Sequence, residues 1–236
     1  MNSNTMRKNE FNRCILSGFL VWMYRFHLLR KICLILIKFF EKEDYFSYTM
    51  RRISKIYYGV EAHAYSSGVS GLISNLAFNE DHRITISRYA AIAKSARIFR
   101  RNHPLERLSA SAFFYEPRFG ITKEHNLAPH KPLFIGPDAE VMANAIITPG
   151  CSHIGVGAVV GCGSVVDKDV PDFAVVSGNP AKIVCFRFSN KTCEIIKASE
   201  WWKYSIDELK PYLAYMSKAL KDEELADNPV LRKIKE

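Results

Sequence analysis

The feature that most constrains the fold of this chain is a six-residue repeat in its second half. From Ile135 the sequence divides into the units IGPDAE, VMANAI and ITPGCS, a single His153, and the units IGVGAV and VGCGSV. Each unit begins with Ile or Val and carries a small residue near its middle. An aliphatic residue at every sixth position fits neither the helical period of about 3.6 residues nor the alternation of a long strand. The repeat predicts short strands that turn a corner after each unit, with three strands forming one triangular coil.

Weaker copies of the repeat lie upstream. ISRYAA and IAKSAR, followed by Ile98, form one candidate coil, and YYGVEAHAYSSG at residues 57–68 forms another, with Ser and Ala where Gly is expected. His153 is one residue more than the period allows, so we expect it to bulge to the surface at a corner. The sequence therefore predicts a mainly β protein whose central domain, residues 51–188, is a parallel β-helix.

Residues 99–134 separate the upstream and downstream coils and are too long for a corner turn. They contain four prolines and no sustained periodicity. A long excursion from a rigid solenoid is a common place for functional residues. The segment NHP at residues 102–104 stands at the start of this protruding loop, so His103 is the first candidate for chemistry.

Residues 1–50 predict a basic, amphipathic helical extension. The formal net charge is +9, and residues 1–60 hold eleven Lys and Arg against four Asp and Glu, so +7 of it lies there. Within residues 1–50 the longest uncharged run, Cys14 to Tyr24, has eleven residues, fewer than the roughly 18 to 20 that span a bilayer. Two interpretations of residues 11–40 stay open: packing on the chain's own domain or a neighbouring subunit, or peripheral contact with an anionic membrane.

Residues 189–236 predict a C-terminal helical region with a charged tail. Ser205-x-x-Glu208 has the spacing of a helix capping box, and Pro211 is expected to kink the helix that follows. The six cysteines show no CxxC pair and no metal spacing, which indicates buried, reduced thiols in a cytoplasmic protein. We expect no nucleic-acid partner.

Several segments together resemble the hexapeptide-repeat acyltransferases. They are SRYAAIA, NHPLERLSASAFF, IGPDAEVMANAIITPG to VVDKDVP, AVVSGNPAKIVCFRF and SEWWKYSIDEL, which span about residues 55–212. The similarity is closest to the xenobiotic acetyltransferases and the polysaccharide O-acetyltransferases. It implies a left-handed parallel β-helix, acetyl-coenzyme A as the donor, and homotrimers with active sites between subunits. It also implies that the loop histidine, here His103, is the general base.

The same resemblance places coenzyme contacts on five residues of this sequence: Ala143, Cys162, Asp167, Lys168 and Lys182. The chain departs from the family pattern nearby, because Glu140 replaces the usual tryptophan, Met142 the usual glycine, and Asp167 a common threonine. A histidine base works best when its second ring nitrogen is held in one tautomer. Glu106 and Glu116 are the nearest candidates in sequence for that role, and the residues do not choose between them.

These observations predict an acetyl-coenzyme A-dependent O-acetyltransferase that acts on a hydroxyl of a bacterial surface glycan or its precursor. An antibiotic O-acetyltransferase and a non-catalytic β-helix scaffold are the alternatives. Carbonic anhydrases with this kind of fold bind zinc through three histidines, and His125 and His130 lie five residues apart, with a third ligand available from His63, His82, His103 or His153. Because His125 and His130 fall in the proline-broken loop, we expect no metal.

Overall fold

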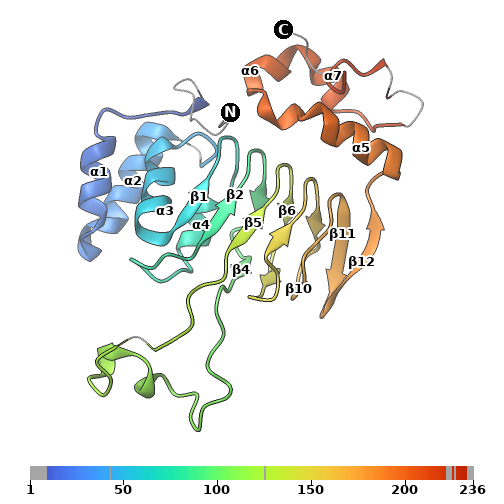
Figure 1. The fold of residues 1–236 in the computed structure, drawn as a ribbon. Coiled ribbons are helices and arrows are strands. Elements are labelled where there is room, and N and C mark those ends of the chain that lie inside the picture. Colours follow the sequence, from blue (N-terminus) through green and yellow to red (C-terminus); the bar gives the residue numbers. More distant parts are fainter. Residues whose placement is uncertain (1–9, 43, 125, 222–224, 226, 233–236) are drawn as a thin grey trace.

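The chain folds around a three-sided stack of parallel strands (Figure 1). The computed structural model describes residues 10–42, 44–124, 126–221, 225 and 227–232. One face holds β1 (Val60–Ala62), β2 (Ile84–Ile86), β5 (Leu133–Ile135) and β8 (His153–Ile154) in that order. The second holds β3 (Ala91–Ile92), β6 (Glu140–Val141), β9 (Val159–Val160), β11 (Ala174–Gly178) and β12 (Ala181–Phe186). The third holds β4 (Arg97–Ile98), β7 (Ile146–Ile147) and β10 (Val165–Val166).

The strand register confirms the six-residue repeat. The first aliphatic of each unit pairs with its counterpart one coil away, as in Ile86 with Ile135, Ile92 with Val141, and Ile98 with Ile147. These residues are buried and form one continuous core along the stack. The two upstream coils predicted from weaker repeats are therefore present. In the coil predicted at residues 57–68, however, Tyr57 and Tyr58 belong to a helix. The left-handed winding stays a prediction.

His153 does not bulge from a corner. It is the first residue of β8, where it pairs with Phe134 and stacks its ring on that side chain at a centroid distance of 5.3 Å. The extra residue is instead absorbed in the turn between β7 and β8, at residues 148–152. A turn can lengthen without shifting the strands on either side, because the strand register depends only on the buried aliphatic residues. The prediction of an exposed histidine was right, and the predicted bulge was wrong.

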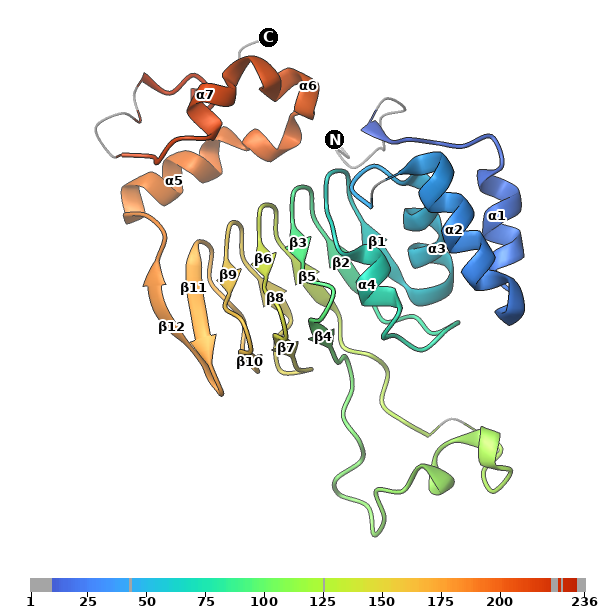
Figure 2. The same cartoon turned by 180° about the vertical axis from the view of Figure 1, so that it is seen from behind.

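Helices cover the end of the stack next to β1 (Figures 1 and 2). They are α1 (Ser17–Tyr24), the short 3-10 turn η2 (His27–Leu29), α2 (Arg30–Glu41), α3 (Tyr48–Tyr58) and α4 (Val69–Ile73). Their buried apolar side chains join the same core as the strands. The helices contain more of the described residues than the strands do, so the predicted mainly β class was too narrow. The predicted three-domain division stays untested, and α3 crosses its boundary at residue 50.

Two buried charged residues fix these helices: Glu41 joins α2 to the start of α3, and Arg51 joins α3 to the first coil. The Glu41 carboxylate accepts hydrogen bonds from the Thr49 hydroxyl at 2.6 Å, the Ser47 hydroxyl at 2.7 Å and the Thr49 N–H at 2.8 Å. Arg51 donates to five backbone carbonyls, including those of His63 and Ser66 in the first coil. Burial lowers the pKa of Arg51 to about 10, against the nearby carboxylates of Asp44 and Glu41. These bonds satisfy groups that would otherwise be costly to bury.

The C-terminal helices follow the β11–β12 hairpin and return across the stack (Figure 2). They are α5 (Asn190–Ser199), η5 (Trp201–Lys203), α6 (Ile206–Leu209), η6 (Lys210–Tyr212) and α7 (Leu213–Met216). The predicted capping box is confirmed, since Ser205 and Glu208 bond reciprocally, and the helix is interrupted at Pro211. Among the residues that the structure describes, no helix combines the length and hydrophobicity needed to cross a membrane.

Arg88 joins the two ends of the chain. Its guanidinium forms an ion pair with Glu10 at 2.8 Å and donates to the backbone carbonyls of Trp202 and Tyr204. The expectation of buried cysteines holds only in part, because Cys33 and Cys151 are buried whereas Cys162 and Cys185 are exposed.

Candidate functional site

The protruding loop leaves the stack after β4 and returns at β5, and it extends away from the solenoid as a long excursion (Figure 1). Among the described residues of the loop, the helical elements are two short 3-10 turns, η3 (Ala112–Phe114) and η4 (Pro117–Phe119). Several of its large apolar side chains are exposed, including Leu108 and Ile121. The loop therefore has little core of its own, and its position depends on how its two ends are held.

Arg100 holds both ends of the loop together. Its side chain is only 2% exposed and donates to the carbonyls of Lys131 and Pro132 at 2.8 Å, and to that of Thr148 at 3.0 Å. Lys131 and Pro132 belong to the returning end of the loop, and Thr148 belongs to the next coil. Burial lowers the pKa of Arg100 below its ordinary value. Sequence reasoning missed this residue, because nothing in RIFRR distinguishes a buried arginine from an exposed one.

His103 lies just beyond this junction and is exposed. Its Nδ1 atom is 2.6 Å from the hydroxyl of Tyr115, whose side chain is only 2% exposed. A phenol hydroxyl therefore meets the second ring nitrogen, where a carboxylate from Glu106 or Glu116 had been expected. In the tautomer that donates from Nδ1 to Tyr115, the lone pair lies on Nε2, which is the arrangement that a general base requires.

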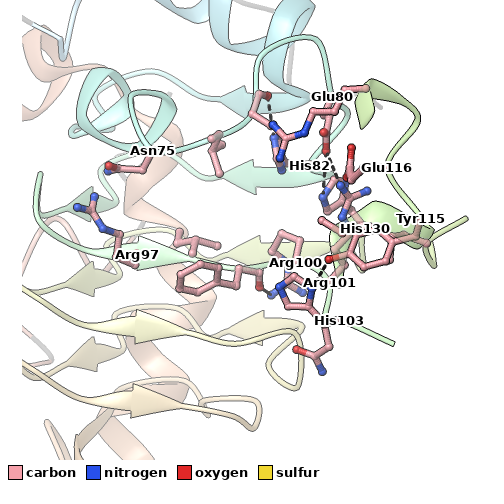
Figure 3. Close-up of a pocket in the computed structure, with 18 residues that line it drawn as sticks. Asn75, Glu80, His82, Arg97, Arg100, Arg101, His103, Tyr115, Glu116 and His130 are labelled. Carbon is pink, nitrogen blue, oxygen red and sulfur yellow. Dashed lines mark hydrogen bonds and ion pairs between the residues drawn. The ribbon is translucent and has the colours of Figure 1, made fainter. Parts of the chain in front are cut away.

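A cavity of about 320 Å³ lies beside His103 and Tyr115. Its lining is rich in charged and polar groups, among them Arg97, Arg101, Arg118, Glu80 and Glu116 (Figure 3). Guanidinium and carboxylate groups form directional hydrogen bonds with hydroxyl-rich or charged ligands. The cavity is therefore suited to a polar ligand more than to a large apolar one.

Two histidines, His82 and His130, also line the same cavity. The rings of His82 and His130 are 4.5 Å apart between centroids, and the Glu80 carboxylate is 3.5 Å from Nε2 of His130. Burial, with His82 and Arg101 close by, lowers the pKa of His130. His125, the other loop histidine considered for a metal, lies outside the described residues.

Three of the predicted coenzyme residues gather along one edge of the stack. Ala143 and Cys162 occupy the same corner on successive coils, where the Gly163 N–H donates to the Ala143 carbonyl at 2.9 Å. Lys182 lies on β12 opposite Ser177, the residue that continues this edge on β11. All three are accessible at the surface.

Asp167 and Lys168 lie at the opposite end of β10, on the corner from which the protruding loop also leaves. The coils approach closely here, since a Cβ at Gly150 would lie 2.2 Å from the Asp167 carbonyl oxygen. Neither residue lines the cavity beside His103, and neither do Ala143, Cys162 or Lys182. One chain thus keeps the candidate base apart from the candidate coenzyme contacts.

Comparison with known proteins finds relatives over much of this region. No family model matches the chain. A "chloramphenicol acetyltransferase" of Agrobacterium fabrum is 31% identical over 142 residues, which are 57% of this chain and 66% of the relative. A "probable macrolide acetyltransferase" of Lysinibacillus sphaericus is 30% identical over 151 residues, which are 61% of this chain and 82% of the relative.

The chain spans less than two thirds of the length of the first two chloramphenicol acetyltransferases that it matches, at 66% and 63%. Among solved structures, a maltose O-acetyltransferase of Clostridium difficile is 20% identical and covers 74% of this chain and 98% of its own, with a TM-score of 0.36. A TM-score this low supports no conclusion about the present protein. The macrolide acetyltransferase, matched over most of its length, together with the six-residue coils, shows that the chain belongs to the hexapeptide-repeat acyltransferase family.

Proposed function

We propose that this protein is an acetyl-coenzyme A-dependent O-acetyltransferase that acetylates a hydroxyl of a bacterial surface glycan or its precursor. The observation that carries the proposal is the pairing of His103 with Tyr115 beside a cavity that several charged residues line. Membership of an acyltransferase family supports the reaction class. We place the reaction in the cytoplasm, where acetyl-coenzyme A is available as the co-substrate.

His103 acts as the general base in this proposal. Its Nε2 atom removes the proton of the acceptor hydroxyl while that oxygen attacks the thioester carbonyl carbon. The tetrahedral intermediate then collapses, the carbon–sulfur bond breaks, and the imidazolium returns its proton to the departing thiolate. In this proposal Nδ1 donates to the Tyr115 hydroxyl, so the lone pair of Nε2 is free. The products are an acetyl ester and the free coenzyme thiol.

The lining of the cavity favours a sugar as the acceptor. Arg97, Arg101 and Arg118 provide guanidinium groups within one small cavity, and such groups bind hydroxyl and carboxylate oxygens with directional hydrogen bonds. An antibiotic hydroxyl is the second candidate, because the relatives carry the names chloramphenicol and macrolide acetyltransferase.

The decisive experiment measures thiol release from acetyl-coenzyme A with a panel of sugars, chloramphenicol and a macrolide. The proposal predicts release with at least one sugar, and a decrease of about 100-fold to 10,000-fold in His103→Ala, the usual contribution of a positioned general base. The exposed His153 provides a matched control, so His153→Ala should retain the rate. Thiol release with an antibiotic but with no sugar would favour the second candidate. If no compound of the panel causes thiol release, a non-catalytic scaffold is favoured.

A homotrimer with shared active sites would unite the separated residues. The cavity that holds His103 contains none of the five coenzyme positions in its own chain, whereas a neighbouring copy can present Ala143, Cys162 and Lys182 to it. We propose this arrangement, in which Asp167 and Lys168 also contact the coenzyme. Closed rings of identical subunits are a common way to complete such a site.

Mixed trimers test the shared site. His103→Ala and Lys182→Glu chains should each be inactive, or nearly so, when expressed alone. If the site is shared, random mixing of the two chains should restore about a quarter of the sites, because each intact site needs one unmodified residue from each side. If both residues act within one chain, mixing restores nothing.

We also propose that the N-terminal helices bring the enzyme to the inner face of the membrane. Several large apolar side chains on α1, on α2 and at the residue before η2 face solvent, although the opposite sides of α1 and α2 are buried: Phe19, Trp22, Phe26, Ile32, Ile35 and Phe39. Basic residues flank them, including Arg25, Lys31 and Lys38, which are also exposed. Exposed apolar residues beside cations match a surface of anionic lipid.

Co-sedimentation with vesicles checks the membrane contact. The full chain should bind anionic vesicles, neutral vesicles should fail to bind it, and added salt should weaken the binding. Ile35→Glu with Phe39→Glu should abolish binding, because these side chains are 69% and 77% exposed and leave the core intact. Leu213→Glu, at an exposed position near the other end of the chain, is the control. A loss of trimers without any vesicle binding would show instead that this surface packs between subunits.

A further inference from the structure

The structure brings together three metal-ligating side chains that lie far apart in the sequence. Glu80, His82 and His130 each offer one ligand atom, and these atoms lie within 4.8 Å of one another. Glu80 and His82 precede β2, and His130 precedes β5, the neighbouring strand in the same sheet. The stacking of two successive coils therefore creates the cluster. Figure 3 shows the three side chains gathered at one side of the cavity.

Hydrogen bonds orient both imidazole rings toward the cluster. Nε2 of His82 is 3.1 Å from the Ala77 carbonyl, and Nδ1 of His130 is 3.1 Å from the Asp81 carbonyl. A carbonyl oxygen only accepts, so each of these nitrogens carries the proton and the other nitrogen of each neutral ring has a free lone pair. Metal-bound histidines characteristically donate their second N–H to a carbonyl in this way.

The spacing also suits a small divalent ion. Zinc binds histidine nitrogen and carboxylate oxygen at about 2.0 to 2.2 Å, so two ligands of a tetrahedral site lie about 3.3 to 3.5 Å apart. The separation between Nε2 of His130 and Oε2 of Glu80 is 3.5 Å. Both histidines are buried, and Glu80 is 30% exposed. Arg101 contacts the same Oε2 atom of Glu80 at 3.2 Å, and a carboxylate oxygen has two lone pairs, so it can accept from an arginine and bind a metal.

We propose that Glu80, His82 and His130 form a binding site for one divalent ion of the zinc class. Two histidines, one carboxylate and an open position make a known zinc ligand set. All three residues line the cavity beside His103, so the fourth position is open to that cavity. Because His130 belongs to the returning end of the protruding loop, the ion ties that end to the turn before β2. The proposed metal site departs from the expectation of no metal drawn from the sequence. The site does not depend on the proposed acetyl-transfer reaction.

Metal content and affinity provide the first test. Full-length protein without a histidine tag is freed of metal with a chelator and titrated with Zn²⁺. We expect about one ion per chain with a dissociation constant of about 1 µM or below. Glu80→Gln and His130→Gln should each weaken binding by at least about 10-fold, and His153→Gln should leave it unchanged. Retention of no ion below about 100 µM, or equal binding by all variants, would overturn the site.

Cobalt substitution tests the ligands without any substitution in the protein, which matters if a variant folds poorly. Co²⁺ in this site should give the visible absorption of a four-coordinate ion without a thiolate-to-cobalt band. A thiolate band would assign the ion to cysteines and overturn the proposal. Proteolysis tests the tether: Zn²⁺ should slow cleavage between residues 99 and 132 in the unmodified protein and have no effect in Glu80→Gln. Unchanged cleavage of the metal-bound protein would overturn the tethering role.

Discussion

The strand stack and the protruding loop differ in how far they bury their apolar side chains. In the stack, the first aliphatic residue of each repeat is buried, and Ile147, for example, has counterparts in the coils before and after it. In the loop, apolar residues such as Leu108, Phe114 and Ile121 remain exposed. Stability thus resides in the repeated coils, whereas the candidate base lies where the chain leaves them.

The largest effect on stability should come from the stack. Ile147→Ala removes a fully buried side chain from the middle strand of its sheet, and we expect the free energy of unfolding to fall by about 2 to 5 kcal/mol. Leu108→Ala, in the exposed part of the loop, should change it by less than about 0.5 kcal/mol. Chemical denaturation at one protein concentration compares the two variants. Equal losses would contradict the division between stack and loop.

A substitution at the junction between the stack and the loop should change both the stability of the fold and the proteolysis of the loop. Arg100→Gln removes a buried guanidinium, which is the donor to the carbonyls of Lys131 and Pro132 and one of two donors to that of Thr148. We expect the free energy of unfolding to fall by about 1 to 3 kcal/mol and proteolysis of the loop to become faster. Arg107→Gln is the control, because Arg107 donates hydrogen bonds to Asn126 within the loop and does not join the loop to the stack through them. If loop cleavage is equally slow in both variants, Arg100 does not hold the loop.

A loop substitution should affect chemistry with little effect on stability. Tyr115→Phe keeps the buried ring but removes the hydroxyl that meets Nδ1 of His103. We expect the acetyl-transfer rate to fall about 10-fold, which corresponds to about 1.4 kcal/mol in the barrier, and the pH profile of the rate to shift. The denaturation midpoint should stay nearly constant. An unchanged rate and pH profile would show that Tyr115 does not position the base.

The smallest effect should come from a corner of the stack. Burial alone would raise the pKa of Asp169, but hydrogen bonds from Ser152 and His153 outweigh it and lower the pKa. A lowered carboxyl pKa stabilises the fold above the unfolded value of about 3.9, and this contribution is lost as pH falls through the folded value. Asp169→Asn should therefore cost at most about 1 kcal/mol at pH 7. The difference from the unmodified protein should shrink below about pH 4, and a constant difference would contradict this account.

The coils could be predicted from the sequence because a buried aliphatic residue marks each one at a fixed spacing. The class of the protein was predicted too narrowly although residues 1–50 and 189–236 were expected to be helical, because α4 and most of α3 lie in the segment predicted as a β-helix. The partner of His103 was missed because η3 brings Tyr115 back over twelve residues of irregular chain. His82 and His130 could have been paired from the repeat alone, because they precede strands one coil apart.

The turn at residues 148–152 and the protruding loop begin at the same corner, after β7 and β4 respectively, yet the strands on either side keep their pairing. Insertions of different lengths at this corner therefore leave the strand pairing along the stack unchanged. Such a corner is a place where segments can be exchanged during evolution without rebuilding the protein. A loop grafted from another acyltransferase between Ile98 and Leu133 would meet the same scaffold, and acceptor preference can diverge while the coils stay the same.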